Sequence, residues 1–155
     1  MARKKNKRRR RGGFTLIEIM VVVMIIGMLS ALVGVRVFSV WEKSKRKGAV
    51  AQMKNFETAL SVYRLDNGRY PTTEQGLDAL IKPPTIEPIP RNYPRGGYLG
   101  ATEVPVDPWG NLYVYFSPGL NGEDFTIVSY GADGVEGGEG DNRDVDSANL
   151  DKESR

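Results

Sequence analysis

Two parts of this 155-residue sequence carry carboxylates in settings that suggest chemistry. Glu18 stands alone inside a long apolar run, and an acidic, glycine-rich segment occupies residues 130–147. The chain has neither cysteine nor histidine, which excludes disulfides, thiol nucleophiles, imidazole catalysis and the usual zinc sites. An enzyme that relied on carboxylates alone would need two of them facing across a cleft. Acids gathered in one loop do not predict that arrangement, so we expect a protein that is not an enzyme.

The residues around Glu18 predict a membrane segment. The apolar run from 14 to 35 exceeds the roughly 20 residues that cross a bilayer as a helix. Eight lysines and arginines precede Gly13, and because the whole chain carries +3, the remainder carries −5. This asymmetry predicts that residues 1–13 stay in the cytoplasm and that the body lies outside. Nucleic-acid binding is not expected, because the basic residues abut the span and have no aromatic residues among them.

Glu18 needs a specific explanation at this depth. A carboxylate in the apolar core of a bilayer costs about 2.5–3.5 kcal/mol, and nothing else in the run 14–35 is ionisable. We expect its partner to come from another chain or from a newly made N-terminus. Cleavage after Gly13 would give Phe14 a free α-amino group within four residues of Glu18. Pairing between staggered neighbours would then build a homopolymer.

A simpler alternative is a secreted calcium-binding protein whose first residues are an ordinary signal peptide. Its cleavage would fall near Ser30, Ala31 or Gly34. The apolar run is long for a signal core, which typically has about 7–15 residues, and such a core has no reason to keep Glu18.

Beyond Arg36 the sequence predicts an amphipathic helix over 36–68, followed by a head over 69–155. Apolar residues recur at helical spacing from Ala49 to Tyr63, and Asn67-Gly68 supplies a stop signal. A continuous helix is favoured, with a hinge near Gly48 or a local unwinding near Gly34 as the alternatives. Runs rich in β-branched and aromatic residues at 112–116 and 125–130 predict strands, and residues 97–99 are a weaker candidate. The fold class is therefore α+β, a long N-terminal helix packed on a small antiparallel sheet.

The segment 130–147 has two interpretations. Its glycines and acids are typical of a solvated acidic tail. They also suit a calcium site, because a hard cation takes six to eight oxygens and glycine lets the backbone supply carbonyls. The spacing is not that of an EF-hand, so the residues alone leave both interpretations open.

The stretch 11–18, RGGFTLIE, resembles the prepilin leader and cleavage site of type IV pilins and pseudopilins. In that class a prepilin peptidase cuts after the glycine that matches Gly13 and methylates the new N-terminal residue, here Phe14. The glutamate that matches Glu18 recruits and registers the next subunit. Segments 63–77 and 107–111 are similar to those of the major pseudopilins of the type II secretion system, so the resemblance covers nearly the whole chain.

The resemblance implies a calcium-binding loop within the head. The matching ligands are Tyr130, Asp133, Asp141, Asn142, Val145 and Ser147. Asn142 stands where a second aspartate is common, and Asp144 or Asp146 would compensate for the lost charge. Calcium would then stabilise a loop with almost no apolar content, in a chain that lacks disulfides.

The implied function is that of a structural subunit that polymerises into a periplasmic filament for protein export. The implied partners are further copies of the chain, minor pseudopilins, the peptidase and methyltransferase, the inner-membrane assembly platform and membrane lipid. A type IV pilin for adhesion, motility or DNA uptake is the alternative within the superfamily. Such pilins usually carry a C-terminal cysteine pair, which this chain lacks.

Overall fold

The computed structural model describes residues 13–150, apart from the side chains of 32–39 and of Asp141. The chain divides into two compact units, one up to Val40 and one from Trp41 onward. A single long helix, α1 (Leu16–Asn67), contributes to both units. The second unit adds three short 3-10 helices, η1 (Leu77–Leu80), η2 (Gly140–Asn142) and η3 (Ser147–Asn149), and three strands, β1 (Val114–Phe116), β2 (Thr126–Ser129) and β3 (Val145–Asp146).

In the first unit, α1 begins with a capping box. The Glu18 backbone N–H donates to Thr15 Oγ1 at 3.3 Å, and the Thr15 N–H donates to Glu18 Oε2 at 3.5 Å. This reciprocal pair satisfies donors that a helix start otherwise leaves unpaired. The predicted leader, residues 1–12, lies outside the described residues.

The apolar run that follows is exposed along its described length. Every side chain from Phe14 to Ala31 is exposed in the isolated chain, including Leu16 at 82%. Within the described residues, no helix combines the length and the apolar character needed to cross a membrane. The predicted span 14–35 includes residues 32–35, whose side chains lie outside the description.

In the second unit, α1 supplies one wall of the core. Met53, Phe56, Leu60 and Tyr63 are essentially inaccessible to solvent, as the helical spacing predicts. The Phe56 ring meets Tyr113 edge-on, with ring centroids 5.1 Å apart. Further buried residues complete this core, among them Leu77, Leu80, Tyr115, Ile127, Val145 and Leu150.

The helix continues through Gly48, so the alternative with a hinge there is wrong. A Cβ at this position would lie 3.3 Å from the Pro108 side chain. The glycine therefore gives the 107–111 turn room to approach α1, which explains a helix-weakening residue without a break.

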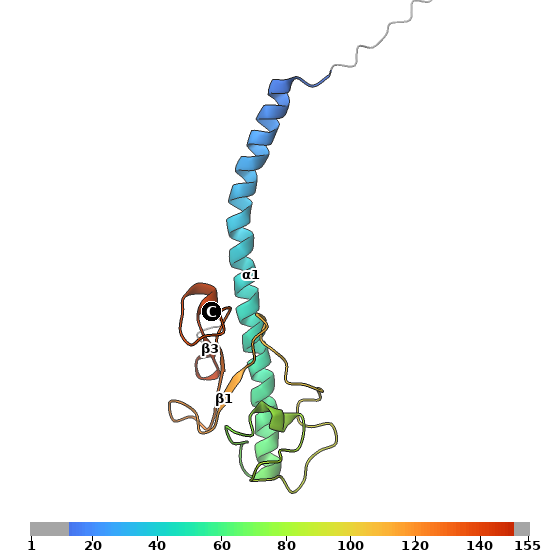
Figure 1. Ribbon diagram of the computed structural model, residues 1–155, viewed down its shortest axis with the longest axis vertical. Helices are drawn as coiled ribbons and strands as arrows, with labels where there is room; N and C mark the ends of the chain where they lie inside the picture. Colours follow the sequence, from blue (N-terminus) through green and yellow to red (C-terminus); the bar gives the residue numbers. More distant parts are fainter. Residues whose placement is uncertain (1–12, 151–155) are drawn as a thin grey trace, which may run out of the picture. The chain divides into compact units, whose positions relative to one another are not determined.

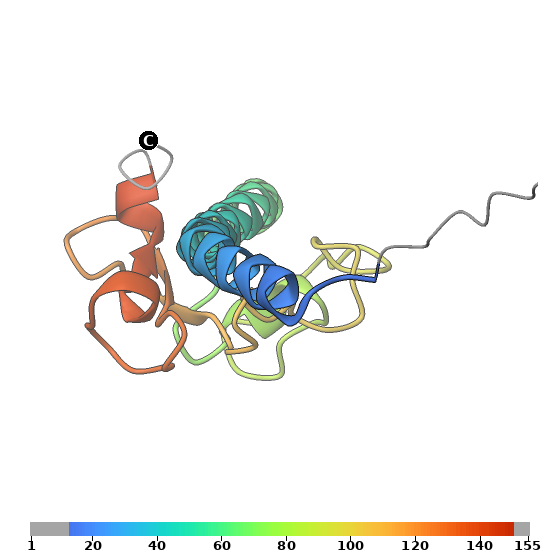
Figure 2. The ribbon, with the colours of Figure 1, turned by 90° about the horizontal axis from the view of Figure 1, so that it is seen from above.

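The three strands form one antiparallel sheet in the order β1-β2-β3. Tyr115 lies opposite Ile127, and Ser129 lies opposite Val145. All four residues of the central strand β2 are buried. The predicted α+β fold is confirmed, although both predicted strands are shorter than expected. Figures 1 and 2 show the loops between η1 and β1 and the C-terminal segment on different sides of the second-unit part of α1.

The weaker strand candidate, 97–99, is wrong, because these residues form a turn. Gly96 and Gly97 both have positive φ, 92° and 73°, and so leave the extended region. The turn instead serves the end of η1, since the Tyr98 and Leu99 N–H groups both donate to the Leu80 carbonyl. A Cβ on Gly97 would lie 2.6 Å from that oxygen, so only glycine fits.

Replacing Phe56 with alanine tests the core directly. Phe56→Ala should lower the free energy of unfolding by about 3–5 kcal/mol, because it leaves a cavity between α1 and the sheet. The control is Leu65→Ala on the same helix, 83% exposed, which should cost less than about 0.5 kcal/mol. Chemical denaturation of the full chain, followed by near-ultraviolet circular dichroism, measures both. Equal effects of the two substitutions would contradict this assignment of the core.

Candidate functional site

The predicted scissile bond, Gly13–Phe14, lies in exposed and non-helical backbone just before α1. Within the part of the chain that the structure describes, no atom beyond the immediate neighbours comes within 4 Å of the position that a Cβ on Gly13 would occupy. The described part of the chain therefore does not block access to this bond. A peptidase needs such access because it must enclose the bond that it cuts. Whether it is cut stays a prediction from the motif.

The Glu18 carboxylate is exposed and has one local donor, the Thr15 N–H. Thr-x-x-Glu before an apolar run is the signature of a capping box, a signal from which this contact could have been predicted. Among the described residues, no lysine or arginine pairs with Glu18. The 3.5 Å contact is long for a hydrogen bond, so the carboxylate retains most of its capacity to accept bonds from another group.

The acidic segment winds from Tyr130 at the end of β2 to Ser147 at the start of η3, through η2 and β3. Its predicted ligands have different environments. Asp133 Oδ1 accepts from the Val135 N–H at 3.2 Å, and Ser147 Oγ accepts from the Ile127 N–H at 2.9 Å. Val145 is buried in β3, and the side chain of Asp141 lies outside the description. Among the side chains that are described, no three acids gather as a metal-binding cluster.

Asp144 is the acid in this segment whose environment fits a cation. Its Oδ2 accepts from the Gly137 N–H at 2.9 Å, whereas its Oδ1 is buried and has no hydrogen-bond partner among the described residues. A buried acceptor without a donor is rare in folded proteins, and a carboxylate oxygen is the ligand that calcium prefers. Burial raises the pKa of the Tyr130 hydroxyl, and the nearby charges of Glu136 and Asp144 raise it further. Negative charge is therefore concentrated at this end of the loop.

Asp146, the other acid expected to compensate for Asn142, is engaged elsewhere. Both of its carboxylate oxygens accept from Asn149 Nδ2, at 3.2 and 3.0 Å. A hard cation would therefore take its oxygen ligands from the Asp144 carboxylate and from carbonyls of the glycine-rich backbone, rather than from Asp146.

The turn at 107–111 adjoins the acidic segment and is held by one buried carboxylate. Asp107 is only 3% exposed. Its Oδ1 accepts from the Trp109 and Asn111 N–H groups, and its Oδ2 accepts from Ser129 Oγ at 2.6 Å. These bonds tie the turn to the end of β2, so its role is structural.

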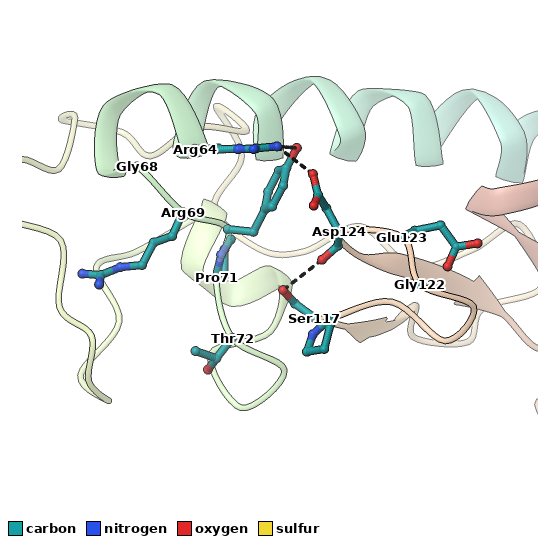
Figure 3. A pocket seen from close by; sticks show the side chains of 11 residues that line it. Arg64, Gly68, Arg69, Pro71, Thr72, Ser117, Gly122, Glu123 and Asp124 are labelled. Atoms are coloured by element: carbon teal, nitrogen blue, oxygen red, sulfur yellow. Dashed lines mark hydrogen bonds and ion pairs between the residues drawn. The ribbon is translucent and has the colours of Figure 1, made fainter.

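A separate groove of about 510 Å³ lies beside the C-terminal end of α1 (Figure 3). Arg64 Nη1 lies 2.6 Å from Asp124 Oδ2 and donates to the Tyr70 hydroxyl at 3.2 Å. Glu123 also lines the groove, where its own backbone N–H and that of Asn121 hold the pKa of its carboxyl below the usual value. Asp124 ties the 117–124 turn to Arg64 of α1, whereas Glu123 accepts from the Asn121 N–H within the turn itself. The contacts in this groove therefore hold the turn in place and suggest a structural role.

Two family descriptions match the chain. Residues 8–34 match the prokaryotic N-terminal methylation motif, and residues 36–148 match the family described as type II secretion system protein G. The first match covers the predicted cleavage and assembly residues, and the second covers the head with its acidic segment.

Individual relatives agree with these matches. The chain is 50% identical over 139 residues to a type II secretion system core protein G of Pseudomonas aeruginosa, covering 90% of this chain and 96% of the relative. It is 47% identical over 144 residues to that of Vibrio cholerae, covering 93% and 96%. Among solved structures it resembles the major pseudopilin from the type 2 secretion system of enterohaemorrhagic Escherichia coli. That match has a TM-score of 0.62 and 42% identity, and covers 71% of this chain and 91% of the other.

Proposed function

Because the chain belongs to the protein G family of the type II secretion system, the major pseudopilins, and is a subunit of the pseudopilus, we propose how its residues perform that role. The family match over residues 36–148 carries the assignment, together with the methylation motif over 8–34. The two alternatives, a type IV pilin and a secreted protein with a simple signal peptide, do not account for both matches at once.

The N-terminal part inserts in the inner membrane, with the leader in the cytoplasm and the head in the periplasm. The positive charge before Gly13 and the apolar run 14–35 support this orientation. A prepilin peptidase then cuts the exposed Gly13–Phe14 bond and methylates the Phe14 amine. The exposed apolar side chains between Phe14 and Ala31 are covered by lipid before assembly and by further copies of the chain afterwards.

Glu18 sets the register between subunits. Its carboxylate makes a long local contact with the Thr15 N–H, and it faces the ammonium group of Phe14 of a neighbouring copy in the assembled filament. In an apolar surrounding such a pair is favourable because each charge is otherwise unsatisfied. The minor pseudopilins and the inner-membrane assembly platform are the other expected partners.

Calcium binds the acidic segment and stabilises the head. Asp133, Asp141 and Asn142 would supply side chains and Tyr130 and Val145 carbonyls, with Ser147 near them. The buried and unpartnered Oδ1 of Asp144 supports adding this residue to the set. Bound there, the ion would supply positive charge that offsets the repulsion between the acids of the loop.

Glu18→Ala tests the assembly role. The variant should insert and be processed normally but fail to form filaments, as judged by electron microscopy of cells that overproduce the protein. The matched control is Ser30→Ala in the same apolar run, where the Ser30 hydroxyl donates to the Ile26 carbonyl of its own helix. Glu18→Gln separates charge from capping, since the amide still accepts from Thr15. Normal filaments from Glu18→Gln would contradict the pairing with Phe14.

Asp133→Ala tests the calcium site. In the full-length protein, calcium at about 100 times its dissociation constant should add roughly 2.7 kcal/mol of stability. A tenfold weaker site should lose about 1.4 kcal/mol of that gain. Thermal melting in calcium and in EGTA measures the shift, and the exposed Asp78→Ala, outside the loop, is the control. An unchanged calcium-dependent shift in Asp133→Ala would remove Asp133 from the ligand set.

A further inference from the structure

The acidic segment is held from outside by a cationic side chain of α1. The Arg46 guanidinium donates to three backbone carbonyls of the segment. Nη1 lies 2.8 Å from the Arg143 oxygen and 3.4 Å from the Gly140 oxygen, and Nη2 lies 3.2 Å from the Asp144 oxygen. These residues are more than 90 positions apart in sequence, and Figure 1 shows the C-terminal segment beside α1 at this level.

Three carbonyls that converge on one cation form an arrangement usually associated with a metal. A guanidinium can replace the ion in part, because it is permanently charged and offers several N–H groups in a rigid fork. Hydrogen bonds to a charged donor are also stronger than those between neutral groups. The acids of this segment repel one another, and a fixed positive charge within reach offsets that repulsion.

The other arm of the segment is held by a neutral contact. Asn111 Nδ2 donates to the Gly131 carbonyl at 2.7 Å. Gly134, with φ of 67°, packs so closely that a Cβ there would lie 3.3 Å from Asn111 Oδ1. Asn111 is itself fixed, because its N–H donates to the buried Asp107 carboxylate and its carbonyl accepts from the Asp107 N–H.

We propose that Arg46 and Asn111 are positioning residues that fold the two arms of the acidic segment before any metal binds. Arg46 holds the distal arm, residues 136–146, and Asn111 holds the proximal arm, residues 130–135. Because the backbone that carries the proposed ligands is already folded, less conformational entropy is lost when an ion enters. The part of this proposal that concerns ion affinity rests on the proposed calcium site, whereas the folding of the metal-free arms does not.

The test is hydrogen–deuterium exchange of the full-length protein in detergent and EGTA. Arg46→Gln should make the amides of the distal arm exchange at least about tenfold faster, because it removes charge-assisted bonds. Lys47→Gln, which removes the same charge at an exposed neighbouring position, should leave exchange unchanged. Asn111→Ala should loosen only the proximal arm. Equal exchange in Arg46→Gln and Lys47→Gln would overturn the proposal.

Calcium titration of the same variants, by isothermal calorimetry, tests the effect on affinity. We expect the dissociation constant for calcium to rise about tenfold in Arg46→Gln, which corresponds to the loss of about one hydrogen bond to a charged group. It should not change in Lys47→Gln. Unchanged affinity despite a loosened metal-free arm would overturn the positioning role. If the unaltered protein binds no calcium, the proposed calcium site fails, while the exchange experiment still decides whether Arg46 folds the arm. Arg46→Lys, which keeps the charge but loses the fork, should give intermediate exchange and guards against a variant that does not fold.

Discussion

The head depends on one physical constraint, which is that its sheet cannot fold without α1. The three strands have three, four and two residues, too few for independent stability. The apolar stripe from Met53 to Tyr63 supplies the missing layer, and the strand residues Tyr115, Ile127 and Val145 are buried with it in one core. A head built in this way cannot detach from its helix without unfolding, which suits a subunit whose helix is its means of assembly.

The same helix meets a different requirement at its start. Its first turns are apolar on every side and exposed in the isolated chain, so they need lipid or further subunits around them. Glu18 is compatible with a lipid environment and with a surrounding of further subunits. The capping box gives its carboxylate a local donor and leaves the carboxylate accessible. The acidic segment is held by elements that also contribute to the core. Arg46 belongs to α1 and Asn111 belongs to the 107–111 turn.

Periodicity and local motifs predicted the parts of the fold that depend on neighbouring residues. The buried stripe on α1 follows from spacing alone, and the Thr15–Glu18 capping box was readable although it was missed. Residues 97–99 have the composition of a strand but form a turn, because the positive φ of Gly96 and Gly97 is not evident from the sequence. The two-residue strand β3 is too short to give a pattern. The roles of Arg46 and of the buried Asp144 Oδ1 could not be predicted from the sequence, because they depend on contacts between segments that are far apart in the chain.

The most direct test of the central claim, that this chain is processed and assembled as a pseudopilin, is the N-terminal sequence and intact mass of the protein purified from its native membrane. The account predicts a chain that begins at Phe14 and carries the mass of one added methyl group. A chain that begins near Val35 would contradict it, because the segment that contains Glu18 would then be absent from the mature protein.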